Sequence, residues 1–416
     1  MKIAMFTNTY LPAVGGIERS VDVTSRRLRE EGHEVLVVAP EYDNAEESTD
    51  EILRVPAIKQ FAGSPFSISL NLPEACAERI ERFSPDIVHS HQPFLLGDSA
   101  LRLARALDVP IVYSNHTFME RYLHWFPVEL QILRDIAESL PVAYANLVDH
   151  VVAPTQSVAQ IMRQRGTSTP ITVIPTGIDA AFYAGGDRRS FRARFGLAPD
   201  HLVIGHLGRL NPEKNLAYLA QVAAHFVAQA PDQRRFLLVG AGDCVDDFRH
   251  AFTNAAIAGQ LVYAGLLQGQ DCADAYAAMD AFVFTSLTDT QGLVLSEAMA
   301  AGNPVFALDA PGARDIITHE RNGYLFEADT PAAAFAARMG QVLSDPVRCA
   351  QMRAEARAAA HALSIPKCTQ AMLALYQSLV DKNAPGARTM TTWEKIKSRW
   401  DVEVDLLQEK LSCLLR

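Results

Sequence analysis

The sequence alternates short, continuous apolar runs with stretches of helical pattern, and it does so in two series. Runs of Val, Ile and Leu without alternating polar residues predict strands that are buried on both faces of a sheet. Strands that alternate with helices are typical of a doubly wound parallel sheet. The expected strands cover residues 3–7, 34–39, 86–90, 111–115, 150–153 and 171–174, and then 202–207, 235–239, 261–264, 281–285, 304–308 and 323–326. We therefore expect one such sheet in each half of the chain, with ligands bound at the carboxyl ends of the strands. Between the two series, residues 177–199 are rich in Gly, Asp and Arg, and this composition predicts a linker.

Composition excludes several classes of protein. The 416 residues are 49% hydrophobic and 21% charged, which suits two packed domains, and no apolar run is long enough to span a bilayer. The opening residues predict a strand rather than a signal peptide, and the six scattered cysteines predict reduced thiols in a cytosol. The net charge of −10 argues against a nucleic-acid-binding surface.

The stretch from Phe284 to Pro304 predicts a strand, a polar turn and then a helix. The turn contains Asp289 and ends at Gly292, and the helix carries Glu297. A glycine turn that opens a helix places backbone N–H groups and the positive end of the helix dipole together, which suits an anion. The two carboxylates could hydrogen-bond hydroxyl groups on either side of a phosphate, as in a nucleotide sugar. The alternative is an ordinary strand–turn–helix unit with a solvated Asp and Glu.

Two cations follow an earlier strand, which ends at Gly208. Arg209 and Lys214 lie five residues apart around a proline turn, and two cations on such a loop suit a diphosphate. Taken singly, either side chain could instead be a solvated surface residue.

The first half of the chain offers a glycine pair and two histidine clusters. Gly15 and Gly16 follow the first strand and open a helical pattern, which favours close approach to a phosphate or sugar, although a simple tight turn is the alternative. His89-Ser-His91 and Asn115-His-Thr117 end later strands, where packed or surface histidines are the alternative. Without ligand spacing or an Asp-x-Asp after a strand, we expect no metal site and no metal requirement.

Together these motifs resemble the retaining glycosyltransferases of family 4 over roughly residues 1–380. The matching residues, in chain order, are Gly15-Gly16, Ile174-Pro-Thr-Gly-Ile-Asp179, Gly208-Arg209 with Lys214, and Asp289 with Glu297. The resemblance implies the α/β GT-B fold, in which two doubly wound, Rossmann-like domains face one another across a cleft. The expected divisions are an acceptor-side domain over 1–177, a nucleotide-sugar domain over 178–365, a crossover helix over 366–384 that packs back on the first domain, and a helical tail over 385–416.

The resemblance also implies roles for the donor-site residues. Asp289 would hold hydroxyls of the donor sugar, Glu297 would hold the ribose, and His116 would touch the donor sugar from the first domain. Arg209 and Lys214 would neutralise the diphosphate. The remaining expected donor contacts are Gly15, Gly16, Gly208, Gln291, the Gly292 and Leu293 amides, and the backbone near Leu266 for the base. The family normally has Glu at both acidic positions, so Asp289 is a departure with a shorter reach.

The acceptor is suggested by the aromatic segment 115–126. It resembles the corresponding stretch of diacylglycerol glucosyltransferases, as does the Asp289-Thr-Gln-Gly292 motif. The acceptor-side candidates are Glu18, His91, Glu120, Tyr122 and Trp125. We therefore expect transfer of a hexose from a nucleotide sugar, most simply UDP-hexose, to diacylglycerol. Alternatives are phosphatidylinositol or a soluble sugar as acceptor, a GT-B-shaped nucleotide-sugar epimerase, and a non-catalytic nucleotide-sugar-binding protein.

The tail places a stripe of large apolar residues on one face of a helix. The stripe consists of Trp393, Ile396, Trp400, Val404, Leu407, Leu411 and Leu414. Such a helix could lie in a membrane interface, pair with a second copy of the chain, or dock on its own domain. With a lipid acceptor, we expect a cytoplasmic enzyme held peripherally on the inner membrane.

Overall fold

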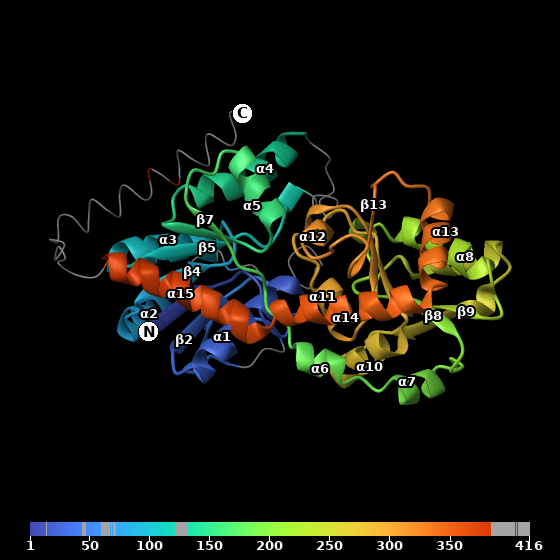
Figure 1. Ribbon diagram of the computed structural model, residues 1–416. Coiled ribbons are helices and arrows are strands. Elements are labelled where there is room, and N and C mark those ends of the chain that lie inside the picture. Colours follow the sequence, from blue (N-terminus) through green and yellow to red (C-terminus); the bar gives the residue numbers. More distant parts are fainter. Residues whose placement is uncertain are drawn as a thin grey trace. The chain divides into compact units, whose positions relative to one another are not determined.

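The structure is a computed structural model that describes residues 1–13, 15–43, 47–59, 67, 69, 72–120, 131–383, 404 and 406. The chain forms two compact units (Figure 1). The first comprises Met1–Gly177 together with Ile365–Arg416, and the second comprises Ile178–Ser364.

The first unit contains a parallel sheet of seven strands. Its order is β3-β2-β1-β4-β5-β6-β7. The strands are β1 (Lys2–Phe6), β2 (Glu34–Pro40), β3 (Ile52–Val55), β4 (Ile87–Ser90), β5 (Ile111–Ser114), β6 (His150–Ala153) and β7 (Ile171–Val173). The helices are α1 (Gly16–Glu30), α2 (Glu74–Phe83), α3 (Leu96–Leu107), α4 (Gln131–Ala145), α5 (Gln156–Gln164) and α15 (Ile365–Asn383).

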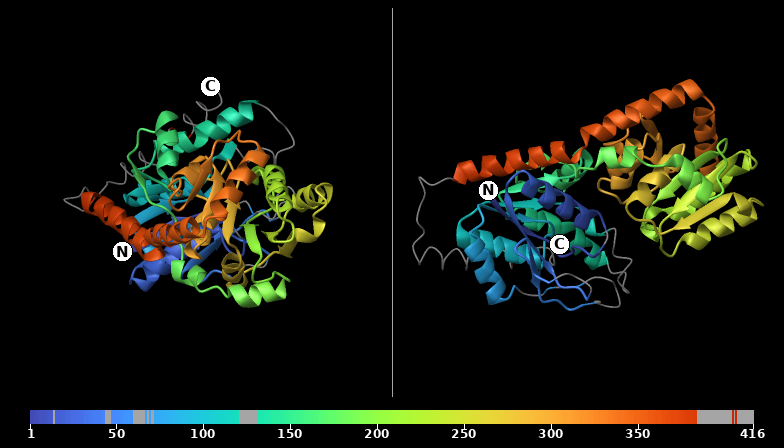
Figure 2. Two further views of the ribbon diagram at one scale, coloured as in Figure 1. Left: turned by 45° about the vertical axis from the view of Figure 1, so that its right-hand side comes forward. Right: turned by 90° about the horizontal axis from the view of Figure 1, so that it is seen from below.

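Helices cover both faces of this sheet. Because successive side chains of a strand point to opposite faces, β1 divides its residues between two hydrophobic clusters. Ile3 and Met5 pack in the cluster that contains residues of α1 and α15, which lie side by side in Figure 2. Ala4 and Phe6 pack in the cluster formed with α2, α3, α4 and α5. Burial on both sides explains why these strands read as continuous apolar runs.

The second unit contains a parallel sheet of six strands in the order β10-β9-β8-β11-β12-β13. The strands are β8 (Leu202–Leu207), β9 (Arg234–Val239), β10 (Leu261–Gly265), β11 (Ala281–Phe284), β12 (Val305–Leu308) and β13 (Gly323–Phe326). The helices are α6 (Ala180–Ala184), α7 (Arg188–Arg194), the 3₁₀ helix η3 (Pro212–Lys214), α8 (Leu216–Ala228), α9 (Val245–Asn254), the 3₁₀ helix η4 (Ala258–Gln260), α10 (Gln270–Ala278), α11 (Leu293–Ala300), α12 (Pro311–Arg314), α13 (Ala332–Leu343) and α14 (Pro346–Ala362).

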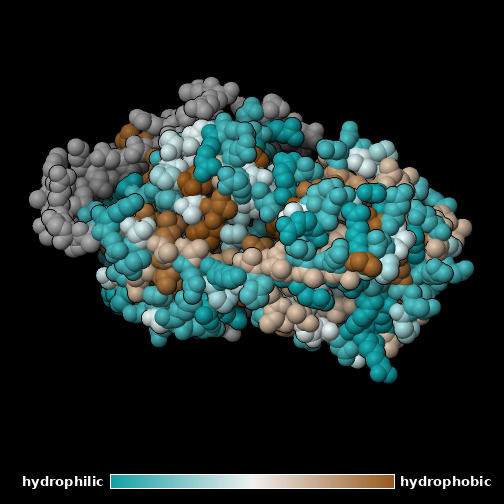
Figure 3. Space-filling view, viewed as in Figure 1, coloured by the Kyte–Doolittle hydropathy of each residue, from teal (hydrophilic) through white to brown (hydrophobic). Residues whose placement is uncertain are grey.

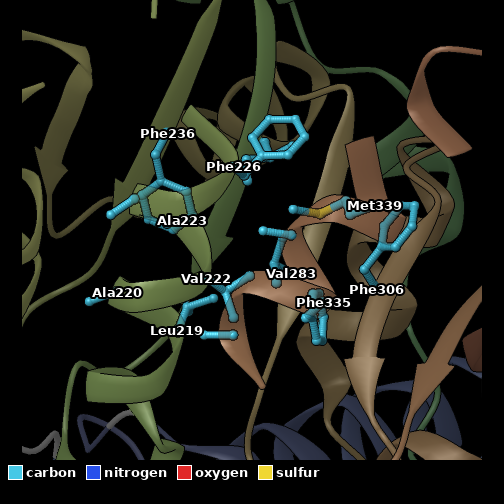
Figure 4. Packing of buried hydrophobic residues seen from close by; sticks show 14 of the residues in the cluster. Leu219, Ala220, Val222, Ala223, Phe226, Phe236, Val283, Phe306, Phe335 and Met339 are labelled. Atoms are coloured by element: carbon cyan, nitrogen blue, oxygen red, sulfur yellow. The ribbon is translucent and has the colours of Figure 1, made fainter. Parts of the chain in front are cut away.

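The core of the second unit also has two halves. On one face, α8 and α13 bring Phe226 and Met339 against Phe236, Val283 and Phe306 of the sheet (Figure 4). On the other face, the apolar residues of α6, α7, α10, α11 and α14 form a second cluster. This packing fixes the strand ends from which the polar loops of the site project.

The expected GT-B class of fold is confirmed, because both units carry a doubly wound parallel sheet. All twelve expected strands are present, and one further strand, β3, was not expected.

The prediction of a linker over residues 177–199 is wrong. The chain enters the second unit directly after Gly177. Gly177 itself packs closely against Ile365, because a Cβ added to Gly177 would lie 2.6 Å from the α-carbon of Ile365. Helices α6 and α7 then pack on α10 of the second unit.

The visible surface is mainly hydrophilic, with scattered apolar residues (Figure 3). Within the described residues, no helix combines the length and the apolar character that crossing a bilayer requires. Of the tail, Val404 is half exposed, whereas Leu406 is 4% exposed and belongs to the core of the first unit. The other six residues of the expected tail stripe lie outside the described residues.

Candidate active site

In the second unit, the two loops that were expected to bind a nucleotide sugar lie next to each other. They follow β8 and β11, which are neighbouring strands of the sheet. Thr285 Oγ1 donates a hydrogen bond to the Asn215 carbonyl (3.1 Å), and Thr288 Oγ1 donates one to the Glu213 carbonyl (3.0 Å). These side-chain bonds tie the loops together at the carboxyl edge of the sheet, where parallel α/β folds bind ligands.

An ion pair joins the two loops. Lys214 Nζ lies 2.7 Å from Asp289 Oδ1, and the side chains are only 13% and 17% exposed. Burial alone would raise the pKa of Asp289, but the charge of Lys214 and its hydrogen bond outweigh this effect, so the pKa lies below its usual value. Asp289 Oδ2 is buried and has no hydrogen-bond partner in the described part of the chain. The pair therefore offers an acceptor oxygen and a cation side by side.

Arg209 is the more accessible of the two cations. Its side chain is 44% exposed, and its Nη2 lies 3.8 Å from Oε1 of Glu213, whose side chain is 1% exposed. A long, largely solvated contact of this kind leaves the guanidinium able to turn toward an anionic ligand. Gly208, an expected donor contact, directly precedes Arg209 at the end of β8.

The loop after β11 leads into α11 through Gly292. This residue has φ +67°, and a Cβ there would lie 2.9 Å from Leu295 Cδ1, so the position favours glycine. Gln291 is buried beside it, and Leu293 begins the helix, whose first-turn N–H groups face the loop. Glu297 is 3% exposed, and its Oε2 accepts a hydrogen bond of 2.8 Å from Tyr276 OH of α10.

Tyr276 was not recognised from the sequence, because its position on α10 is indistinguishable from an ordinary core position. Burial, followed by the negative charge of Glu297, raises its pKa well above the usual value, so the phenol stays protonated and donates. It therefore fixes one oxygen of Glu297.

A second residue missed by sequence reasoning is His206 of β8. It is 2% exposed, and its Nδ1 lies 3.0 Å from the Val283 carbonyl. The sequence gives one indication that this residue is unusual, because it places a polar side chain within a buried strand, two positions before Gly208.

In the first unit, the glycine loop and Glu18 form one group. Gly15 precedes α1 and Gly16 is its first residue. Glu18 is 5% exposed, and its Oε1 accepts a hydrogen bond from Thr9 Oγ1. A Cβ at Gly15 would collide with the Glu18 carboxylate. The Glu18 carboxylate therefore packs directly against the glycine loop.

The histidines at the ends of β4 and β5 lie together in the structure. His91 Nδ1 lies 2.9 Å from His116 Nε2, and the two rings are stacked with centroids 5.2 Å apart. His89 bonds Ser114 Oγ at 2.8 Å and Tyr376 OH at 2.5 Å. Burial lowers the pKa of His116 to about 4 and that of His89 to about 3, and it lowers the pKa of His91 well below its usual value. The cluster is neutral at physiological pH and lines a cavity of about 20 Å³, enough for one water.

The other acceptor-side candidates are placed differently. Glu120 accepts a hydrogen bond from Arg165 Nη2 at 2.7 Å, so its Oε1 has a structural partner. Tyr122 and Trp125 lie outside the described residues. Leu266, expected near the base, follows β10, and the residue is 68% exposed. Among the described residues, no group of three His, Cys, Asp or Glu could hold a metal ion.

Both halves of the chain match known protein families. The model described as Glycosyltransferase Family 4 matches residues 14–182, and that described as Glycosyl transferases group 1 matches residues 187–359. An α-monoglucosyldiacylglycerol synthase of Streptococcus pneumoniae is 26% identical over 78% of this chain and 75% of its own. A GDP-mannose-dependent α-mannosyltransferase of Mycobacterium tuberculosis is 30% identical over 78% of this chain and 83% of its own.

Solved structures share the fold at lower identity. HepE of Anabaena in complex with UDP has a TM-score of 0.70 and 21% identity, covering 91% of this chain and 100% of that one. Sucrose-phosphate synthase of Thermosynechococcus elongatus has a TM-score of 0.73 and 20% identity, covering 92% and 99%.

Proposed function

The chain belongs to glycosyltransferase family 4, whose members are retaining enzymes, and on that premise we propose that it transfers a hexose from UDP-hexose to 1,2-diacylglycerol. The product is a glycolipid, and the enzyme works peripherally on the cytoplasmic face of the inner membrane. The observation that carries the donor half of this proposal is the buried Lys214–Asp289 pair, which lies on the loops that also carry Arg209 and Gly292.

The donor half follows from charge and hydrogen bonding. A diphosphate needs cations and N–H groups, which Lys214, Arg209 and the first turn of α11 supply. A sugar hydroxyl needs an acceptor, which Asp289 Oδ2 supplies. Glu297, whose Oε2 accepts a hydrogen bond from Tyr276 OH, is the residue that we propose holds the ribose hydroxyls.

The chemistry is a substitution at the anomeric carbon with retention. The bond from that carbon to the diphosphate oxygen breaks, and a new bond to the acceptor oxygen forms on the same face. The acceptor proton passes to the departing diphosphate. Lys214 and Arg209 stabilise the negative charge that grows on this leaving group, so catalysis rests on electrostatics and positioning.

Two similarities to other proteins support diacylglycerol as the acceptor. The named product class of the Streptococcus pneumoniae relative is a glucosyldiacylglycerol, and the segment 115–126 resembles that subgroup in sequence. The apolar stripe of the tail would supply a membrane contact.

A second candidate is favoured by one observation. The Mycobacterium tuberculosis relative is named for GDP-mannose and has the higher identity of the two, 30%. This candidate is a transfer of mannose from GDP-mannose to phosphatidylinositol or to a soluble sugar acceptor.

A donor-by-acceptor panel tests both candidates. Purified enzyme is incubated with UDP-glucose, UDP-galactose, UDP-glucuronate or GDP-mannose, each with diacylglycerol micelles, phosphatidylinositol micelles or no acceptor, and products are identified by mass spectrometry. We expect a hexosyl-diacylglycerol from a UDP-hexose. Mannosyl-phosphatidylinositol would establish the second candidate, and conversion of the donor without acceptor into its epimer would establish an epimerase.

A further inference from the structure

His206 lies beneath the loop that follows β8, and its hydrogen bonding determines its tautomer. Its Nδ1 is 3.0 Å from the carbonyl oxygen of Val283 on β11. A carbonyl oxygen only accepts, so Nδ1 carries the proton and donates. In the neutral ring, Nε2 is then an acceptor. Its ring packs against Phe282 and Phe284 at centroid distances of 5.7 and 6.5 Å, which holds this orientation.

The Nε2 atom of His206 is buried and has no hydrogen-bond partner in the described part of the chain. It points toward Gly208, because a Cβ at that residue would lie 3.5 Å from it. Buried acceptors without partners are rare, and each one calls for an explanation. Here the unpartnered nitrogen lies beside Gly208, which we expect to contact the donor.

The charges around His206 are those of the proposed donor site. Lys214 of η3 lowers its pKa, while Asp289, on the loop after β11, raises it. The neighbouring Arg209 and Glu213 pair with each other on the same loop as Lys214. Burial is the largest influence and lowers the pKa of His206 to about 4, so the ring is neutral in the free protein at physiological pH.

We propose that His206 is a further donor-site residue, whose Nε2 takes up one proton from solvent when the diphosphate of a nucleotide sugar binds beside Gly208. The protonated Nε2–H then donates a hydrogen bond to a phosphate oxygen, which gives the buried nitrogen its partner. No other bond forms or breaks in this step. The inference rests on the proposed donor site, and it adds a proton to the binding reaction.

The size and sign of the effect follow from electrostatics. One negative charge within about 4–6 Å raises a histidine pKa by roughly one to three pH units, and a diphosphate carries about two such charges. A pKa that rises from about 4 in the free protein to about 7 in the complex makes binding roughly tenfold tighter at about pH 6 than at about pH 8. Because the complex binds the extra proton, affinity increases as pH falls.

Calorimetry of UDP-glucose binding to the full-length protein tests this inference. Each phosphate of UDP-glucose carries one ester and one anhydride bond and has a single, strongly acidic ionisable oxygen, so the ligand takes up no proton near neutral pH. Titrations at about pH 6 in two buffers of different ionisation enthalpy give the number of protons bound, for which we expect roughly half to one. The variants are His206→Gln and, as a matched control, His225→Gln, which replaces an exposed histidine of α8 in the same unit.

We expect the wild type and His225→Gln to take up the proton and to bind more tightly at about pH 6, and His206→Gln to lose both properties. Proton uptake that persists in His206→Gln would assign the proton to another group, such as His116, and overturn the inference. Binding without proton uptake in the wild type would overturn it without any variant, even if His206→Gln did not fold. An absence of UDP-glucose binding would instead contradict the proposed donor itself.

Discussion

The replacement of Lys214 by alanine tests the proposed diphosphate site most sharply. Lys214 and Asp289 are both less than one-fifth exposed, so solvent screens their charges weakly. Removal of one donor to a developing anion costs about 2.7–4 kcal/mol in other enzymes, and we expect kcat to fall roughly a hundredfold to a thousandfold. Arg209 is 44% exposed, so Arg209→Ala should cost less, about tenfold to a hundredfold. Arg321→Ala, which removes an exposed ion-paired arginine of the same unit, should leave kcat unchanged.

The same substitution makes a prediction about stability and pH. Lys214→Ala leaves the Asp289 carboxylate buried without its cation, a change that costs about 3–5 kcal/mol in buried pairs. In the wild type the lowered pKa of Asp289 contributes stability above its unfolded pKa of about 3.9, and this contribution is lost as pH falls through the folded pKa. In Lys214→Ala burial dominates and the pKa of Asp289 rises, so acidification from about pH 7 to about pH 5 should recover stability.

Urea unfolding across this pH range, together with initial rates, separates the two effects. Lys214→Ala combined with Asp289→Asn should regain stability without regaining activity, because the buried charge is gone but the cation is still missing. A folded Lys214→Ala protein with a kcat near that of the wild type would refute the diphosphate role.

Three further predictions follow from the same site and from the tail. Glu297→Ala should chiefly raise KM for the donor, and Asp289→Ala should chiefly lower kcat. Asp289→Glu should be tolerated. An unchanged kcat of Asp289→Ala in steady-state kinetics would contradict the role of Asp289 in holding the donor sugar. Activity should persist in excess EDTA, and a loss that Mn²⁺ or Mg²⁺ restores would reveal a metal site. Deletion of residues 387–416 should leave a protein that still binds nucleotide, sediments less with vesicles, and is destabilised by about 1.5–3 kcal/mol through the loss of buried Leu406; vesicle binding that is unchanged by the deletion would exclude a membrane-docking tail.

Most of the fold could be predicted because strands buried on both faces have to be apolar throughout. Strand β3 escaped prediction because Arg54 interrupts its short apolar run. The structure accommodates this buried guanidinium by hydrogen bonds to the carbonyls of Pro40 (3.2 Å) and Leu11 (2.7 Å), which a sequence cannot display.

The supposed linker shows a different kind of error. Its Gly and Asp residues suggested a flexible segment, yet Asp179 and Asp187 cap α6 and α7 by accepting hydrogen bonds from the N–H groups of Phe182 and Ser190. Aspartate is one of the residues preferred at the N-cap of a helix, and this signal could have been weighed against the glycines.

The candidate site could be predicted only in part from the sequence. The two loops were predicted from strand ends, but the 2.7 Å pair between residues 75 positions apart depends on β8 and β11 being neighbours in the sheet. The supporting roles of Tyr276 and His206 depend on side-chain orientation, which no local pattern in the sequence encodes.

The central claim is a retaining transfer of a hexose to a lipid hydroxyl, and the anomeric configuration of the product tests it most directly. Purified enzyme, UDP-glucose and diacylglycerol should give a glucosyl-diacylglycerol whose anomeric proton shows the α configuration of the donor by NMR. A β-linked product, or free glucose and UDP without any lipid product, would contradict it.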